Sequence, residues 1–340
     1  NHNIYHDVKE RKPLREEDMI IKYSDFPIRL KISRLAWIHF LIHSFLVSLK
    51  SFFALFTGDF LHAILLKEYP LIYLSTKAKS NNLALKYFFH NSTRLFRPLW
   101  TYNAEKKGSE IILYYYSTNN SPLKLKSSHF KDFGSKKIMT WNTCYIWDSN
   151  QENYLKKYMP TANFKKVGPI WFESCNKRLP CFGKGNRVIS VFDIQTYKEE
   201  FYQTLGIPDR YITTKNMTKF QNDIHKVLNN VEKVKVILKR KRASRKGFHD
   251  ESYLSHLIKI YNGKKFIQIS PDFSAKSIIK KSYLTISFPG TSTALISKND
   301  NIKSIYYDPI KEIDSNDKTL LGIKLVSGID ELYEYIDEII

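Results

Sequence analysis

From Leu85 onward, short apolar runs alternate with stretches of helical character, and this alternation constrains the fold of the 340-residue chain more than any other feature. The runs include "EIILYYY" at 110–116, "VISVF" at 188–192 and "VKVILK" at 234–239. Short runs rich in Val, Ile and Tyr suit buried strands, and helices between consecutive strands imply βαβ units with a parallel sheet. The sequence therefore predicts an α/β fold.

One stretch divides the alternating region. Residues 173–187, "ESCNKRLPCFGKGNR", combine Pro, Gly and charge without an apolar period, which is typical of a linker. We expect a mainly helical region at 1–80 that packs on the first lobe, Rossmann-like domains at 81–172 and 188–340, and a cleft between those domains. Ligands in such sheets bind beyond the carboxyl ends of the strands, so each loop after a strand is a candidate site.

The most apolar segment lies at 35–57, "LAWIHFLIHSFLVSLKSFFALFT". At 100° per residue, His39, His43 and Lys50 share a narrow stripe, and apolar side chains cover most of the remainder. A lysine in mid-segment costs roughly 2.5–3.5 kcal/mol on insertion scales, which argues against a membrane span. We expect a buried helix, with an interfacial membrane helix and a true span as alternatives.

Charge and cysteine content limit the partners. The chain has 54 Lys and Arg against 33 Asp and Glu, a formal net charge of +21, which favours an anionic partner such as nucleic acid, phospholipid or a phosphorylated small molecule. No nucleic-acid-binding signature is evident, so we expect no nucleic acid partner. Cys144, Cys175 and Cys181 have no metal-ligand spacing, so we expect no metal site, no disulfide framework and a reducing cytosol. No secretory signal is visible at the start.

The stretch "SFPGTSTALI" at 287–296 follows an apolar run and predicts a strand that ends and a helix that begins. Free backbone N–H groups, the positive end of a helix dipole and three hydroxyls suit one phosphate. An ordinary Ser or Thr helix cap is the alternative. The candidate phosphate-binding residues are Pro289, Gly290, Thr291, Ser292 and Thr293.

Two further strand ends carry charge. The segment "LKRKRASRKGFHD" at 238–250 places Lys239, Arg242 and His249 beyond the strand 234–238, where cations can neutralise a nucleotide phosphate or a sugar carboxylate. A solvated basic turn is the alternative. Asp193 ends the strand "VISVF", and we include it among the catalytic candidates, although an Asp after a strand is also a common turn residue.

In the first α/β domain, the loops after strands carry polar side chains that face the predicted cleft. His90 and Asp148 are the two groups placed to act as a base, and Asp148 can equally cap the helix that follows. The remaining candidates for acceptor and cleft contacts are Asn91, Ser92, Arg94 and Asn119.

Several strings occur together in the order seen in one known family. They are "FFHNSTRLFRPLWTYNAEKKGSEIILYYYSTN" (88–119), "CYIWDSNQENYL" (144–155), "KVGPIWF" (166–172), "VISVFDIQ" (188–195), "YQTLGI" (202–207), "ILKRKR" (237–242), "SPDFSA" (270–275) and "SFPGTSTALI" (287–296). With them, the chain resembles bacterial polysaccharide-biosynthesis proteins of the PFTS-motif family over roughly residues 85–335. Here Pro-Gly-Thr-Ser at 289–292 stands in place of the family's usual Pro-Phe-Thr-Ser.

The resemblance implies a surface-glycan glycosyltransferase of the two-domain GT-B type, with acceptor binding at 81–172 and nucleotide-sugar binding at 188–340. The chain is similar, more distantly, to transferases of CMP-activated keto-acid sugars such as Kdo, sialic or pseudaminic acid. Residues 294–297 lack the glutamate of many UDP-sugar enzymes, and His249 resembles a sialyltransferase histidine, with Asp250 in place of the following proline.

The expected reaction needs a nucleotide-sugar donor and a glycan or lipid-linked glycan acceptor, and no other cofactor or metal. We expect a cytoplasmic protein, peripheral on the inner face of the bacterial inner membrane. The alternatives are a GT-B enzyme that uses a UDP- or GDP-sugar, a basic nucleic-acid-binding protein, and a silent scaffold anchored through 35–57.

Overall fold

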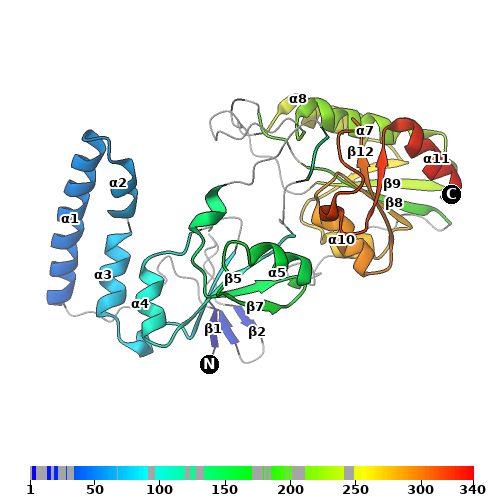
Figure 1. Cartoon of the computed structure of the whole chain (residues 1–340). Coiled ribbons are helices and arrows are strands. Elements are labelled where there is room, and N and C mark those ends of the chain that lie inside the picture. Colours follow the sequence, from blue (N-terminus) through cyan, green and yellow to red (C-terminus); the bar gives the residue numbers. More distant parts are fainter. Residues whose placement is uncertain are drawn as a thin grey trace. The chain divides into compact units, whose positions relative to one another are not determined.

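The computed structural model describes most of the chain and groups it into two compact units (Figure 1). The N-terminal unit comprises Asn1–Tyr115 and Gly134–Lys166, and the C-terminal unit comprises Tyr116–Phe133 and Val167–Ile340. The described residues are 2–4, 14–16, 19–21, 28, 34–66, 68–90, 96–118, 123–126, 134–170, 179, 182, 185–194, 196–198, 200, 211–240 and 249–340.

The N-terminal unit contains a four-stranded parallel sheet in the order β4-β5-β6-β7. Its strands are β4 (Lys86–His90), β5 (Glu110–Tyr114), β6 (Thr143–Ile146) and β7 (Asn163–Lys166), and its helices include α4 (Trp100–Lys106) and α5 (Ser149–Leu155). Ile111, Ile112 and Leu113 of β5 are fully buried, as expected for the interior of a parallel sheet. The apolar stretch "KKIMTW" at 136–141 does not form a strand: its first part lies in the 3₁₀ helix η2 (Gly134–Ile138), and Met139 N–H donates to Lys136 O.

The first part of this unit holds a helical hairpin. Helix α1 (Arg34–Phe56) packs along α2 (Phe60–Leu66) and α3 (Tyr69–Lys77), and α3 packs against α4 (Figure 1). Only 6% of the apolar window Trp37–Phe56 is buried, so the interpretation of this segment as a buried core helix is wrong. Before it, β1 (His2–Ile4), β2 (Leu14–Glu16) and β3 (Met19–Ile21) form a small sheet in a region that we expected to be mainly helical.

The C-terminal unit is built on a six-stranded parallel sheet in the order β10-β9-β8-β11-β12-β13. The strands are β8 (Arg187–Phe192), β9 (Val234–Lys239), β10 (Phe266–Ile269), β11 (Leu284–Ser287), β12 (Lys303–Asp308) and β13 (Lys324–Ser327). The helices are α7 (Thr214–Asn229), α8 (Glu251–Ile260), α9 (Ala275–Ile279), α10 (Ser292–Asn299) and α11 (Ile329–Ile339).

This strand order is that of a doubly wound sheet, because the chain first builds outward from β8 to β10 and then restarts at β11 on the other side of β8. The point where the direction of winding reverses lies between β8 and β11. Ligands bind at this switch point in open α/β sheets. The two parallel sheets confirm the α/β, Rossmann-like prediction.

Candidate functional site at the switch point of the C-terminal sheet

The ends of β8 and β11 bring two predicted segments side by side. Ser287 pairs with Phe192 in the parallel register, and Phe288 N–H donates a 2.9 Å hydrogen bond to Phe192 O. Asp193 and Pro289 therefore leave the sheet next to each other, at the switch point.

The turn after β11 is tight and depends on glycine. Thr291 donates both its N–H and its hydroxyl to Phe288 O, over 3.2 and 2.9 Å. Gly290 has a φ of 82°, in the left-handed region that side chains with a Cβ rarely adopt. A Cβ at Gly290 would lie 3.4 Å from Leu123 Cδ1. The local backbone thus favours glycine at the second position of the Pro-Gly-Thr-Ser sequence.

The hydroxyls of the turn are organised around the start of α10. Thr293 Oγ1 lies 3.0 Å from Ser287 Oγ and 3.2 Å from Thr291 Oγ1. Ser292 Oγ accepts from Thr118 N–H at 3.0 Å and also bonds Thr118 Oγ1 at 2.9 Å.

Thr291 holds the N-cap position of α10, yet in the described structure no side chain caps this helix. The Ser or Thr cap that the sequence allowed is therefore not made. The positive end of the α10 dipole and its first amides remain suited to an anion.

Asp193 lies beside this turn with a carboxyl group that is only half satisfied. The residue is 3% exposed, and its Oδ2 accepts a 2.7 Å hydrogen bond from Tyr253 OH. Its Oδ1 is buried without a partner among the residues that the structure describes. Burial raises the pKa of Asp193 from 3.8 to about 6, against the opposing effects of the Tyr253 hydrogen bond and of Arg240 and Lys239.

A buried polar chain holds Asp193 in place. Tyr261 OH donates to Gln221 Oε1 at 2.7 Å, and Gln221 Nε2 donates to Tyr253 OH at 3.3 Å. Tyr253 then donates to Asp193. These residues come from α7, from α8 and from Tyr261 directly after α8, and no local sequence pattern links them to the end of β8.

A second buried aspartate shows what a purely structural role looks like. Asp308 ends β12 and accepts from Tyr211 OH at 2.9 Å and from the N–H groups of Ile310 and Ile313 at 3.1 and 2.8 Å. Both of its carboxylate oxygens are occupied in shaping the loop after β12. The unpartnered Oδ1 of Asp193 distinguishes Asp193 as the residue with capacity for a ligand.

The basic strand end lies on the other side of β8. Lys239 ends β9, which pairs with β8, and is 9% exposed. Arg240 follows it, with a buried Nε that has no hydrogen-bond partner in the described part of the chain. Arg242 lies outside the described residues.

His249 is packed within the unit. It is 5% exposed, its Nδ1 lies 3.2 Å from Thr196 O, and its ring stacks on Tyr197 with centroids 5.0 Å apart. Asp250, which stands where the sialyltransferase motif has proline, caps α8 by accepting from the N–H groups of Ser252 and Tyr253.

The candidates of the N-terminal unit are less defined. His90 is exposed at the end of β4. Asp148 caps α5 by accepting from Gln151 N–H at 2.9 Å, which is the structural role that the sequence allowed. Asn91, Ser92, Arg94 and Asn119 lie outside the described residues, so their assignment stays a prediction.

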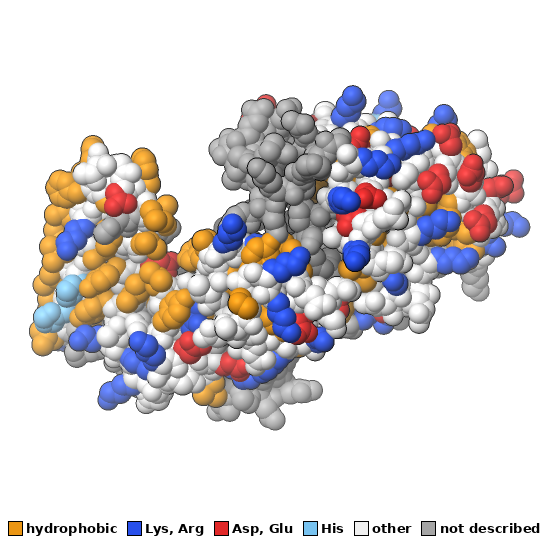
Figure 2. Space-filling model, in the orientation of Figure 1, with side chains coloured by type: hydrophobic (Ala, Val, Ile, Leu, Met, Phe, Trp, Pro, Cys, Tyr) orange, Lys and Arg blue, Asp and Glu red, His pale blue; other side chains and the backbone are white. Residues whose placement is uncertain are grey.

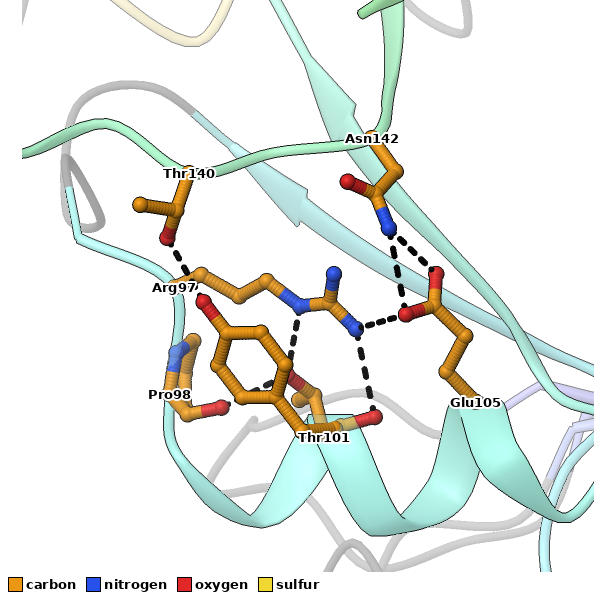
Figure 3. Close-up of polar contacts among 7 residues, drawn as sticks. Arg97, Pro98, Thr101, Glu105, Thr140 and Asn142 are labelled. Atoms are coloured by element: carbon orange, nitrogen blue, oxygen red, sulfur yellow. Dashed lines mark hydrogen bonds and ion pairs between the residues drawn. The ribbon is translucent and has the colours of Figure 1, made fainter.

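The N-terminal unit also contains a buried arginine that sequence reasoning missed. Arg97 is 2% exposed, and its Nη2 forms a 2.7 Å ion pair with Glu105 Oε2 (Figure 3). Its Nε donates to Thr101 Oγ1 at 3.0 Å, and Asn142 Nδ2 donates to the same Glu105 carboxylate. This cluster joins both ends of α4 to the start of β6. It therefore accounts for Glu105 as a structural residue.

Comparison with known proteins gave one family match and several distant structural likenesses. The family described as polysaccharide biosynthesis PFTS motif protein matches residues 47–336. No curated protein matches.

Among solved structures, the chain is similar to S. aureus MnaA with UDP, at 11% identity and a TM-score of 0.47, over 80% of this chain and 71% of that one. It is also similar to the α,α-trehalose 6-phosphate synthase of Burkholderia multivorans, at 7% identity and a TM-score of 0.45, over 98% of this chain and 78% of that one.

Proposed function

Because the chain belongs to the polysaccharide biosynthesis PFTS motif family, we propose that it is a glycosyltransferase of bacterial surface polysaccharide assembly, such as capsule, O-antigen or lipopolysaccharide. We further propose that the donor is a CMP-activated keto-acid sugar and the acceptor a glycan hydroxyl. One observation carries this proposal: the uncapped start of α10, with its hydroxyl-bearing turn, lies beside the half-satisfied carboxyl of Asp193 at the switch point of the sheet.

The donor phosphate is assigned to the turn at 289–293. The hydroxyls of Ser292 and Thr293 and the amides of the first turn of α10 offer donors to phosphate oxygens. Negative charge grows on the phosphate as its bond to the sugar breaks, so donors already fixed in place stabilise the transition state. A single helix N-terminus suits the one phosphate of a CMP-sugar.

The donor sugar is assigned to the adjacent strand ends. Asp193 Oδ1 would accept a hydrogen bond from a sugar hydroxyl, and the cations Lys239 and Arg240 would pair with the carboxylate of a keto-acid sugar. His90 and Asp148 remain the candidate bases for the acceptor hydroxyl, with Asp193 as the third. A carboxyl with a pKa of about 6 is largely ionised at neutral pH and is basic enough to assist proton transfer.

The alternative donor is a UDP- or GDP-sugar. A second phosphate and a ribose would need further contacts on α10. The positions available for them, Ala294 to Ser297, are buried and carry no carboxylate. Ser297 directs its hydroxyl to Thr293 O at 2.9 Å, toward the helix and not toward a ligand. This favours the CMP-linked donor.

Thermal unfolding with nucleotides tests the proposal. We expect CMP to raise the unfolding midpoint more than UMP, UDP or GDP, and we expect Ser292→Ala to reduce that protection. Ser304→Ala is the matched control. It removes a comparable hydroxyl bond, from Ser304 Oγ to Ala294 O at 3.0 Å, and Ser304 lies at the start of β12, away from the carboxyl end of the strand. Protection by UDP alone would refute the CMP assignment and leave a transferase. Equal protection of wild type and the Ser292→Ala variant would refute the phosphate site.

A further inference from the structure

The hairpin of α1 and α2 exposes an unusual amount of apolar surface. The described residues include 25 exposed large hydrophobic side chains, of which 12 lie on α1 and 4 on α2. Phe45, Phe53 and Phe56 are 67, 60 and 75% exposed, and Leu61 is 70% exposed. Figure 2 shows hydrophobic side chains along the hairpin, with few charges between them. A continuous apolar surface of this extent marks an interaction site.

Near its tip, the hairpin has small side chains inside and large apolar side chains outside. There α1 turns Val47 and Ser51 to its partner helix, and α2 contributes the buried Ala63. Toward the base, Phe40 and His43 of α1 pack on Tyr73 of α3, with ring centroids 6.4 and 5.0 Å apart. In a water-soluble hairpin the large apolar residues would fill this interface. Small residues inside and large apolar residues outside are typical of helices packed in lipid.

Exposed apolar residues cover two opposite faces of the hairpin, the outer face of α1 and the outer face of α2. On α1 the exposed side chains span about half the circumference at 100° per residue, centred away from α2. On α2, Leu61 and Leu65 are exposed on the side away from the buried Ala63. A single protein partner would cover one apolar face of the hairpin, whereas the lipids of a bilayer contact every face of an inserted segment.

Charged groups are few along the hairpin, although one of them, Asp59, is exposed in the turn between α1 and α2. Between residues 35 and 66 the only charged side chains are Lys50 and Asp59. The base of the hairpin, away from the turn between α1 and α2, carries the exposed Arg34 and Lys77, and Trp37 is 42% exposed near the start of α1. Aromatic residues next to cations match the order of acyl chains, interface and anionic headgroups in a bilayer.

We propose that the tip of the hairpin, residues 45–66, inserts into one leaflet of a lipid bilayer and anchors the N-terminal unit. Helix α1 has 23 residues and is long and apolar enough to cross a membrane, but α2 has only 7 residues, about 10 Å. That length fits one leaflet, about 15 Å of hydrocarbon, and not a full crossing. The chain therefore enters and leaves on the same side.

The base of the hairpin is tied to the rest of its unit. Lys107, directly after α4, donates from Nζ to the carbonyl oxygens of Ser75, Thr76 and Ala78, over 2.7, 2.7 and 2.6 Å. Insertion of the tip would thus hold the N-terminal sheet close to the membrane, where a lipid-linked acceptor lies. The anchor itself does not depend on the proposed chemistry.

Vesicle flotation of the full chain tests the proposal. The vesicles are phosphatidylcholine alone and phosphatidylcholine with phosphatidylglycerol, each at 0.05 and about 0.5 M salt, since high salt screens adsorption that depends only on the net charge of +21. The test variants are Phe53→Glu and Leu61→Glu. The controls are Leu85→Glu and Ile258→Glu, whose side chains are 74 and 62% exposed outside the hairpin.

We expect wild type and both controls to float with either vesicle at high salt. In the hairpin variants, the fraction of protein that floats with the vesicles should fall at least tenfold. Failure of wild type to float at high salt, or equal flotation of hairpin and control variants, would overturn the proposal. If the hairpin variants instead abolish a dimer seen by sedimentation velocity, and flotation is unchanged, a second copy of the chain covers the hairpin.

Depth-dependent quenching by brominated lipids tests the orientation. A tryptophan introduced by Phe56→Trp, near the tip, should be quenched more strongly by lipids brominated near the bilayer centre than by lipids brominated near the headgroup. Trp37 should show the reverse, measured as the difference from Trp37→Phe. Equal depths at both positions would indicate a hairpin that lies flat, and would refute tip-first insertion.

Discussion

Asp193→Asn is expected to stabilise the C-terminal unit at neutral pH. In the folded protein, burial raises the pKa of Asp193 from 3.8 to about 6, and a shift of about 2 units corresponds to about 3 kcal/mol. Between these pH values the folded state binds more protons than the unfolded state, so the free energy of unfolding falls as pH rises through this window. The penalty is absent below pH 4 and complete above about pH 7.

Asparagine keeps the shape of the side chain and can accept from Tyr253, but it cannot ionise. Its amide nitrogen offsets part of the gain, by about 1 kcal/mol or more at every pH, because it is buried without a partner. The advantage of the variant over wild type should therefore grow by about 3 kcal/mol between pH 4 and pH 7.5. A residue that costs stability where it is charged is expected at a functional site.

Hydrogen exchange resolved by mass spectrometry gives the local free energy of opening without assuming that both units unfold together. Peptides that cover β8 and β11 should exchange more slowly in the Asp193→Asn variant than in wild type at pH 7.5, after correction for intrinsic rates. The two proteins should converge toward pH 4. A difference that is the same at both pH values, or a wild type that is more stable at pH 7.5, would refute the reasoning.

Three further substitutions test a contact of Asp193, the turn at Gly290 and the Arg97 cluster. Tyr253→Phe removes the hydrogen bond that lowers the pKa of Asp193, so β8 should lose protection at a higher pH in the variant than in wild type; the same pH in both would show that this bond does not affect the carboxyl. Gly290→Ala should lower the unfolding free energy by about 1 kcal/mol, because φ is 82° there, and weaken CMP binding in calorimetry; Gly263→Ala, at an ordinary φ, is the control. Arg97→Ala should lower the free energy of unfolding by about 2 kcal/mol, seen as faster exchange in α4 and β5, because it removes the hydrogen bonds of a buried guanidinium to Glu105 and Thr101; exchange like that of wild type would show that the cluster is not structural.

The strands were predictable because parallel strands, buried on both faces, are continuous apolar runs. Ile189 and Val191 of β8, and Ile237 of β9, all lie in such runs and are fully buried. Neither β13 nor α11 was predicted; β13 is a short edge strand whose Lys324 is exposed, so it forms no continuous apolar run. Helix α1 was correctly predicted as a helix but wrongly as a buried one, because apolar periodicity does not show whether protein, lipid or water covers a helix face.

The site was predictable only in part. Asp193 and the turn at 289–293 were found because each directly follows an apolar run, and the sheet then places them together. Tyr253 lies 60 residues from Asp193 in sequence, and only the packing of α8 on α7 brings it to the carboxyl group. The missing helix cap was also beyond the sequence, since Thr291 has the right chemistry for a cap but turns its hydroxyl to Phe288 O.

A crystal structure of the protein with CMP measures the central claim most directly. We predict the CMP phosphate within hydrogen-bond distance of the Ser292 or Thr293 hydroxyl and of an amide in the first turn of α10, with Asp193 facing the position of the sugar. A phosphate bound elsewhere, with the 289–293 turn empty and α10 still uncapped, would contradict the account.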